Sequence, residues 1–129
     1  MNVEEYFKEM YANIWQGNDL NKLDDYYAKD FEEAISVCDE NKNPIEIKMK
    51  YDDLVRQAIW QKENYENTTL ELRKIVKGLD NHISVYFYSS SRDKKTGELR
   101  HRYVCGIWRL NLHKQIDRVW AVVTPYYPL

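Results

Sequence analysis

The sequence predicts an α+β domain in which three N-terminal helices pack on one face of a curved, mainly antiparallel sheet. Two observations predict this fold. Apolar residues recur at helical spacing in the first half of the chain, and from Thr68 onward their period changes to two. Short polar turns also interrupt the second half, and strands joined by such turns pair antiparallel. With 129 residues, the chain is expected to form a single domain, residues 1–129, whose core needs no disulfide or metal.

The N-terminal segment has the pattern of an amphipathic helix. Apolar and aromatic side chains recur at helical spacing from Val3 to Ile14. Asn2 and Glu5 have the spacing of a capping box, in which two side chains bind backbone N–H groups of the first turn. We therefore expect a first helix over residues 3–16.

A glycine turn separates this helix from a second one. Gly17 is expected to adopt the positive φ that often ends a helix, and Asn18 or Asp19 to cap the next helix through a side-chain oxygen. The second helix is predicted over residues 19–29. The remaining predicted elements are a third helix over 50–64 and strands over 34–38, 45–47, 68–78, 82–91, 99–111 and 114–124.

Composition excludes several kinds of partner. The net charge of −2 favours no basic face, so we expect no nucleic-acid partner. No apolar run is long enough to span a membrane, and the acidic N-terminus lacks the features of a signal peptide, so we expect a cytoplasmic protein. Cys38 and Cys105 lie in apolar runs without metal-ligand spacing, and we expect buried free thiols. Without a glycine-rich phosphate loop or a metal-binding pattern, we expect no cofactor and no metal.

Both faces of the last two long strands are apolar. On the last strand, Val119, Ala121 and Val123 alternate with Trp120 and Val122. Three helices can cover only one face of a twisted sheet, so a further surface must cover the other. We expect a homodimer in which a second copy of the chain packs on the outer face of the sheet.

Two motifs resemble those of a known family. The first is W-x-x-x-D-x-x-x-L-x-x-x-Y-A-x-D-F, from Trp15 to Phe31, and the second is K-x-I-x-R-x-W, from Lys114 to Trp120. With this order of elements, the chain resembles the nuclear transport factor 2-like superfamily, and most of all its SnoaL-like and ketosteroid isomerase-like group. The resemblance implies a cone-shaped fold with a pocket between the helices and the concave sheet, often in a homodimer.

Ketosteroid isomerase-like proteins use three catalytic residues, and the resemblance gives a counterpart in this sequence for one of them. Tyr11 falls where ketosteroid isomerase-like proteins have a tyrosine on the first helix. The position of their base falls near Ile35 or Ser36, and the position of their buried acid falls at Gly106. None of these last three residues can exchange a proton at neutral pH.

Asp117 is the carboxylate that the sequence favours as a general acid or base. It shares its predicted strand face with Val119 and Ala121, and a carboxyl group among apolar neighbours keeps its proton to higher pH. The alternative is a residue at the start of the strand that is solvated or paired with Arg118 or Arg102. Tyr11 would steady negative charge on a substrate, or it would belong to the core. The residues expected to line the pocket are Tyr11, Trp15, Ile35, Ala58, Trp108, Val119 and Ala121.

Two classes of function fit this sequence. The first is binding of a small apolar or aromatic molecule, with isomerisation, cyclisation or dehydration by cofactor-free proton transfer. The second is a non-catalytic dimerisation or protein-interaction module, or a ligand carrier, on the same fold. An inward-facing carboxylate and tyrosine hydroxyl in an apolar cavity would favour the enzyme. A cavity filled by aromatic side chains would favour the module.

Overall fold

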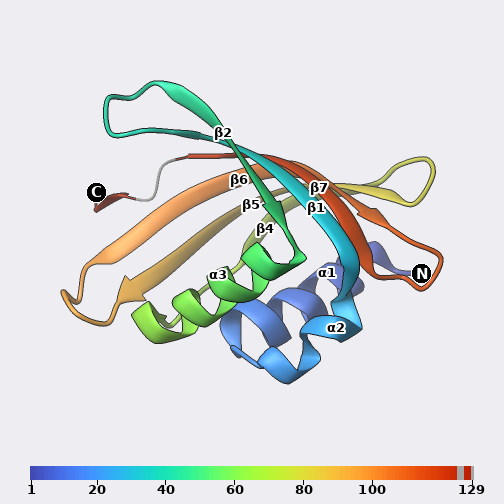
Figure 1. Cartoon of the computed structure of the whole chain (residues 1–129), viewed down its shortest axis with the longest axis horizontal. Helices are drawn as coiled ribbons and strands as arrows, with labels where there is room; N and C mark the ends of the chain where they lie inside the picture. Colours follow the sequence, from blue (N-terminus) through green and yellow to red (C-terminus); the bar gives the residue numbers. More distant parts are fainter. Residues whose placement is uncertain (125–126, 129) are drawn as a thin grey trace.

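A curved mixed sheet wraps over three α-helices in the computed structural model, which describes residues 1–124 and 127–128 (Figure 1). The helices lie together against the concave, inner face of the sheet. The helical segments are α1 (Val3–Tyr11), a π-helical turn (Ala12–Gln16), a 3-10 turn (Leu20–Lys22), α2 (Leu23–Tyr26) and α3 (Tyr51–Asn64). The α+β class predicted from the sequence is confirmed.

The strands form one sheet in the order β2-β1-β7-β6-β5-β3, with β4 also pairing with β5 and β8 with β6. Neighbouring strands are antiparallel except for β1 and β7, which run parallel. Their bounds are β1 Tyr27–Cys38, β2 Pro44–Lys50, β3 Tyr65–Glu66, β4 Glu71–Lys77, β5 His82–Asp93, β6 Leu99–Leu110, β7 Ile116–Val123 and β8 Tyr127–Pro128.

The second helix is much shorter than predicted, and this is a correction. α2 ends at Tyr26, and β1 begins at Tyr27 instead of residue 34. Tyr27 already pairs with Ile116 of β7, a long-range contact that local helical spacing cannot reveal. The longer strand brings Glu33 within the sheet, where it pairs with Val119.

The turn after the first helix also differs in detail from the expectation. Gly17 has a φ of −83°, and the positive φ of 53° belongs to Asn18. Gly17 is needed for another reason, because a Cβ there would lie 2.8 Å from the Ala12 carbonyl oxygen. Its N–H donates to that oxygen, which closes the π-helical turn. The expected cap is found at Asp19, whose side chain accepts a hydrogen bond from the Asn21 N–H.

The apolar core lies between the helices and the inner face of the sheet. Phe7, Met10 and Ile14 project from the first helical segment and are 1% exposed, as is Leu54 of α3. Phe7 packs edge-on against Trp108 of β6, with their ring centroids 5.3 Å apart. This packing holds the helices on the sheet and leaves a pocket beside the aromatic cluster.

The outer face of the sheet carries a second apolar surface. It is exposed in this single chain and comprises Tyr86, Tyr103, Ile107, Trp120 and Val122, which we call the outer-face patch. Cys105 lies on β6 between Tyr103 and Ile107, and both free cysteines, Cys38 and Cys105, are exposed. The expectation of buried thiols was therefore wrong, because apolar neighbours in sequence did not mean a covered face.

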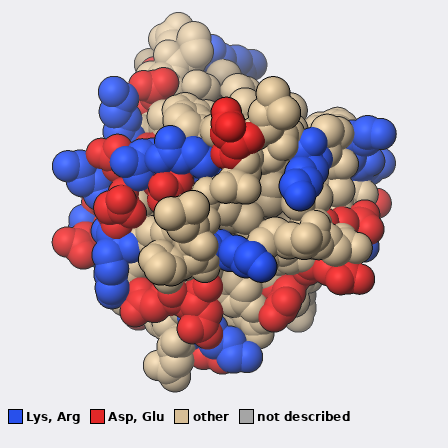
Figure 2. Space-filling view, turned by 90° about the vertical axis from the view of Figure 1, so that its right-hand side faces the viewer, with Lys and Arg blue, Asp and Glu red and all other residues tan. Residues whose placement is uncertain are grey.

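Charged side chains are distributed without a single dominant sign. The side of the molecule shown in Figure 2 has Lys and Arg side chains interspersed with Asp and Glu. Among the described residues, no helix combines the length and apolar character needed to cross a membrane.

Candidate functional site

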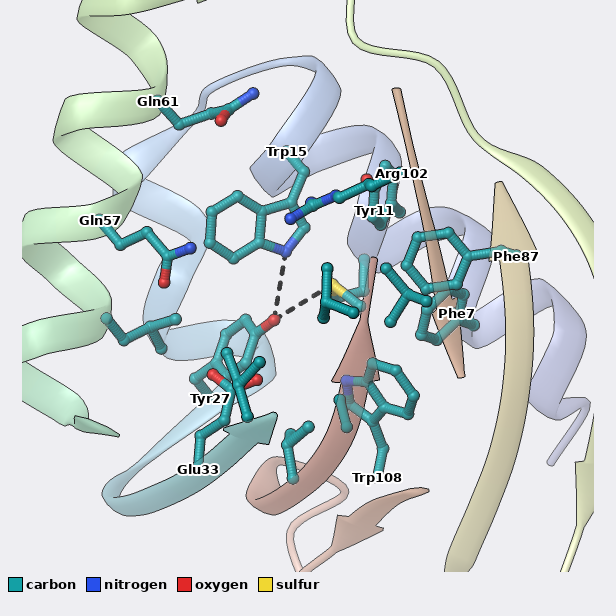
Figure 3. A pocket seen from close by; sticks show the side chains of 17 residues that line it. Phe7, Tyr11, Trp15, Tyr27, Glu33, Gln57, Gln61, Phe87, Arg102 and Trp108 are labelled. Atoms are coloured by element: carbon teal, nitrogen blue, oxygen red, sulfur yellow. Dashed lines mark hydrogen bonds between the residues drawn. The ribbon is translucent and has the colours of Figure 1, made fainter. Parts of the chain in front are cut away.

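A pocket of about 80 Å³ opens between the helices and the inner face of the sheet. Side chains from α1, the π-helical turn, α3 and strands β1, β5, β6 and β7 form its wall (Figure 3). The wall is mostly apolar and aromatic, with a few polar groups. The lining residues are Phe7, Met10, Tyr11, Trp15, Tyr27, Glu33, Ile35, Leu54, Gln57, Gln61, Phe87, Arg102, Val104, Trp108, Val119, Ala121 and Val123.

Glu33 is the only carboxylate among the described residues that line this pocket. It lies on β1, on the same face as Ile35, opposite Val119 of β7. Burial raises the pKa of its carboxyl group from 4.5 to about 7, against the opposing effect of the positive charge on Arg102. A carboxyl group with this pKa can both accept and release a proton near neutral pH.

Tyr27 lies beside Glu33 and is held by two hydrogen bonds (Figure 3). Its hydroxyl accepts from the Trp15 indole N–H at 3.2 Å and donates to the Met10 sulfur at 3.6 Å. The pKa of the Tyr27 hydroxyl lies above its ordinary value. The main cause is burial, and the negative charge of the nearby Glu33 carboxylate adds to it. Tyr27 therefore stays protonated at neutral pH, and its one hydroxyl proton is donated to the Met10 sulfur, a weak acceptor.

Hydrogen bonds to Ser89 of β5 and to Thr68, which precedes β4, hold two further residues of the pocket wall. The Tyr11 and Ser89 hydroxyls are 3.0 Å apart, and both residues are buried. Gln61 of α3 donates from its amide to the Thr68 hydroxyl at 3.0 Å, and the Thr68 and Ser91 hydroxyls are 2.7 Å apart. These bonds fix the orientation of Tyr11 and Gln61, because a buried polar group keeps its partners.

The structure places most of the predicted pocket residues on the pocket wall. Those on the wall are Tyr11, Trp15, Ile35, Trp108, Val119 and Ala121. Ala58 is buried, at 2% exposed, but it is not on the wall. Their role in binding a ligand remains a prediction.

Asp117 does not line the pocket, and the predicted orientation of its side chain was wrong. It is the extra residue of a β-bulge, since Leu110 pairs with Ile116 while Arg109 pairs with Arg118. Its carboxylate accepts two hydrogen bonds from the Arg109 guanidinium, at 2.9 and 3.1 Å. Successive side chains of a strand point to opposite faces, so Arg109, which follows the inward-facing Trp108, points to the outer face. Because the Asp117 carboxylate binds Arg109, it lies on the outer face as well. The alternative of an ion pair with an arginine was right in kind, but the partner is Arg109 and not Arg118 or Arg102.

Sequence reasoning missed Glu33 and Arg102. Glu33 was placed before a predicted strand rather than in it, and no local pattern shows which side of a strand faces a distant helix. Arg102 was not among the predicted pocket residues, although the alternation of β6 places it on the same face as Val104 and Trp108. That alternation was the available signal.

Comparison with known proteins supports the fold and leaves the activity open. No family model matches the chain, and no curated protein matches it. Among solved structures, one similar to it is a proposed isomerase from Bacillus subtilis, with a TM-score of 0.70 and 12% identity over 97% of this chain and 91% of that one. A phenazine biosynthesis-related protein from Pseudomonas aeruginosa has a TM-score of 0.67 and 18% identity over 95% and 74% of the chains. IdmH from Streptomyces antibioticus, a proposed polyketide cyclase, has a TM-score of 0.65 and 13% identity over 88% and 86%.

These similarities define the class of fold. The chain shares the nuclear transport factor 2-like, ketosteroid isomerase-like fold of these structures. At these identities the likeness says nothing of substrate or reaction. Among the described residues, no group of three or more His, Cys, Asp or Glu side chains is placed to hold a metal ion.

Proposed function

We propose that this protein binds a small molecule in the pocket and moves a proton to or from it through the Glu33 carboxyl group. The observation that carries the proposal is a half-buried carboxyl group whose pKa is raised by burial to about 7, on a pocket wall lined mostly by apolar and aromatic residues. Such a group accepts a proton in one step and returns it in the next at neutral pH.

Besides a base, this chemistry requires a hydrogen-bond donor to the substrate, and neighbouring tyrosine hydroxyls can supply it. Removal of a proton from carbon places negative charge on the substrate, and a donor aimed at that charge lowers the barrier. Tyr27 lies beside Glu33 with its hydroxyl proton retained, and this proton can turn from the Met10 sulfur, a weak acceptor, to the substrate anion. Tyr11 lies on the same wall. Isomerisation, cyclisation and dehydration all use this pairing of a base with a hydrogen-bond donor.

A non-catalytic ligand carrier or interaction module is the competing function. Trp15, Tyr27 and Trp108 narrow the pocket, as a filled module would require, but an ionisable carboxyl group faces the same space. A carrier or module has no need of a buried acid, whose ionisation at neutral pH costs folding free energy. This cost favours the proton-transfer proposal.

Glu33→Gln is the variant that tests the proposal. Carbon-detected NMR titration of the wild-type protein should give a Glu33 pKa near 7, and a deuterium-exchange screen of small carbon acids should reveal catalysed exchange. The variant should lose that exchange, while Glu32→Gln, one residue away on the opposite face, should keep it. An ordinary acidic pKa for Glu33, or undiminished exchange by Glu33→Gln, would refute the assignment.

We also propose that two copies of the chain pair through the outer-face patch. Its side chains are between 40% and 63% exposed in the single chain and lie on three adjacent strands. Exposed apolar surface of this kind marks an interface. Sedimentation velocity should show a dimer for the wild-type protein and a monomer for Val122→Asp, while Leu112→Asp, in the β6–β7 turn, should remain dimeric. A monomeric wild-type protein would contradict the proposal.

A further inference from the structure

We propose that Trp108 is a catalytic residue of this pocket, whose indole N–H donates a hydrogen bond to an oxygen atom of the bound molecule and stabilises the negative charge that forms there. The inference rests on the proposed function of the pocket and adds the group that holds the substrate oxygen. It is carried by the position of this N–H, which faces the pocket (Figure 3) and has no hydrogen-bond partner in the described part of the chain.

Most hydrogen-bond donors of the pocket wall already have a partner. The engaged groups are the Tyr11 and Tyr27 hydroxyls, the Trp15 indole N–H and the Gln61 amide. Among the indole, amide and hydroxyl groups of the described lining residues, two have none, those of Trp108 and Gln57. Trp108 is only 7% exposed, and a polar group in so buried a position is seldom left unpaired. A ligand oxygen would supply the missing acceptor.

Trp108 is aligned with Glu33 across the sheet. Glu33 of β1 pairs with Val119 of β7, which pairs with Trp108 of β6, and all three line the pocket. Two strand spacings, about 10 Å, separate the backbones of Glu33 and Trp108, with the small Val119 side chain between them. In Figure 3 the indole nitrogen lies on the side of its ring toward Glu33. A ligand over Val119 therefore has a carboxyl group on one side and an N–H donor on the other.

Packing fixes the direction of this N–H. The ring centroid of Trp108 lies 5.3 Å from that of Phe7 and 6.4 Å from that of Phe87. Both rings are on the side of Trp108 away from its nitrogen (Figure 3). Gln57, in contrast, is half-buried, and its amide is at the end of a flexible side chain of α3. A donor that needs no reorganisation when charge forms contributes most to catalysis, which favours Trp108 over Gln57.

The proposed step needs only the two side chains and a substrate with a carbonyl group. The Glu33 carboxylate takes a proton from the carbon atom next to the carbonyl group, and the electron pair of that C–H bond forms a C=C bond. The π pair of the carbonyl group moves to its oxygen, which becomes an enolate anion bound to the Trp108 N–H. The Glu33 carboxyl group then returns the proton to carbon, which restores the carbonyl group. Trp108 keeps its proton throughout, because an indole N–H is a donor only.

The volume of the pocket sets the size of suitable probes. Its 80 Å³ is about half of the roughly 150 Å³ of an engineered apolar cavity that binds benzene. Acetone fits such a space, and isobutene has nearly the same shape with a CH₂ group in place of the oxygen. Acetone can accept a hydrogen bond from Trp108 and isobutene cannot.

NMR titration with acetone and with dissolved isobutene tests the proposal in the wild-type protein. The reporter is the indole N–H resonance of Trp108. Acetone should move this resonance to higher frequency, as a new hydrogen bond does, and isobutene should not. A resonance that acetone leaves in place would overturn the proposal.

Trp108→Phe tests the same point by removal of the donor. Relative to isobutene, acetone should bind the variant roughly 2- to 10-fold more weakly. Catalysed deuterium exchange of acetone should fall roughly 100- to 1000-fold. Trp60→Phe is the matched control, because Trp60 is 52% exposed and does not line the pocket, and it should behave as wild type.

The alternative is that Trp108 serves only in the core. In that case Trp108→Phe would change the affinities for acetone and isobutene by the same factor, and this result would overturn the proposal. If the smaller ring prevents folding, benzothienylalanine at position 108 keeps the shape of the indole and replaces the N–H by sulfur. The ratio of the two affinities then gives the same answer.

Glu33→Gln separates this inference from the proton-transfer role. The variant should lose the exchange of acetone and keep the acetone-dependent shift of the Trp108 resonance. If Glu33 had an ordinary pKa while the shift was present, proton transfer by Glu33 would fail and the Trp108 donor would stand. If the shift was absent while Glu33→Gln still lost the exchange, only the assignment of Trp108 would be wrong.

Discussion

Replacement of Glu33 by glutamine should make the protein more stable at alkaline pH. In the folded protein the pKa of Glu33 is about 7, compared with an ordinary value of 4.5. The folded state therefore holds this proton more tightly than the unfolded chain does, and stability falls as the pH rises from about 4.5 to about 7. Across that window the difference corresponds to a loss of about 3 kcal/mol, which persists at higher pH.

Glutamine has the shape of the protonated side chain and never ionises. Below about pH 4.5, where Glu33 is protonated in both states, the variant and the wild type should have similar free energies of unfolding. At about pH 8 the variant should be more stable by up to about 3 kcal/mol, because only the wild type keeps a buried charge. A variant that gains stability by losing a carboxylate would show that the acid is retained at a cost to the fold.

Urea denaturation followed by tryptophan fluorescence measures this difference over a series of pH values. Glu32→Gln is the control, since the Glu32 side chain is 53% exposed and pairs with Arg118. That control should show no comparable gain at alkaline pH. If Glu33→Gln were equally or less stable than wild type above neutral pH, the Glu33 carboxylate would not be buried in the way that we describe.

Three further substitutions test separate features of the structure. Gly106→Ala should destabilise the protein by about 1–3 kcal/mol in urea denaturation, because a Cβ there would lie 2.6 Å from the Trp120 carbonyl oxygen. Asp117→Asn should destabilise it by about 1–3 kcal/mol, since Arg109 loses a charged partner, and should leave ligand binding intact. In Val122→Asp, thiol labelling of Cys105 should be faster than in wild type if the outer-face patch is covered by a second copy.

Periodicity was sufficient to predict the elements whose contacts are local or regularly alternating. The third helix was predicted to span 50–64 and spans Tyr51–Asn64. The hairpin of β5 and β6 was also located to within two residues, because both strands alternate without interruption between inner and outer side chains. The cap at Asp19 followed from the preference of a side-chain oxygen for the first N–H groups of a helix.

Prediction failed where a long-range pairing decides the local structure. Residues 27–29 were predicted to be helical and residues 30–33 to precede the strand, yet all of them lie in β1 because that segment pairs with β7. A step of five positions along β1, from Tyr27 to Glu32, matches a step of only two positions along β7, from Ile116 to Arg118. This irregularity cannot be predicted from the sequence of either strand alone. It determines that the regular pairing of β1 with β7, and with it the alternation of inner and outer side chains, begins at Glu32.

Two irregular pairings, that of β1 with β7 and that of β6 with β7, decide which carboxylate enters the pocket. Alternation along β7 places Asp117 with Val119 and Ala121, but one extra residue in that strand turns it to Arg109 on the other face. Alternation along β1, once its register with β7 is known, brings Glu33 to the inner face opposite Val119. The acid of the site thus depends on strand register, and the reasoning that an inward carboxyl group should have a raised pKa applies to Glu33 in place of Asp117.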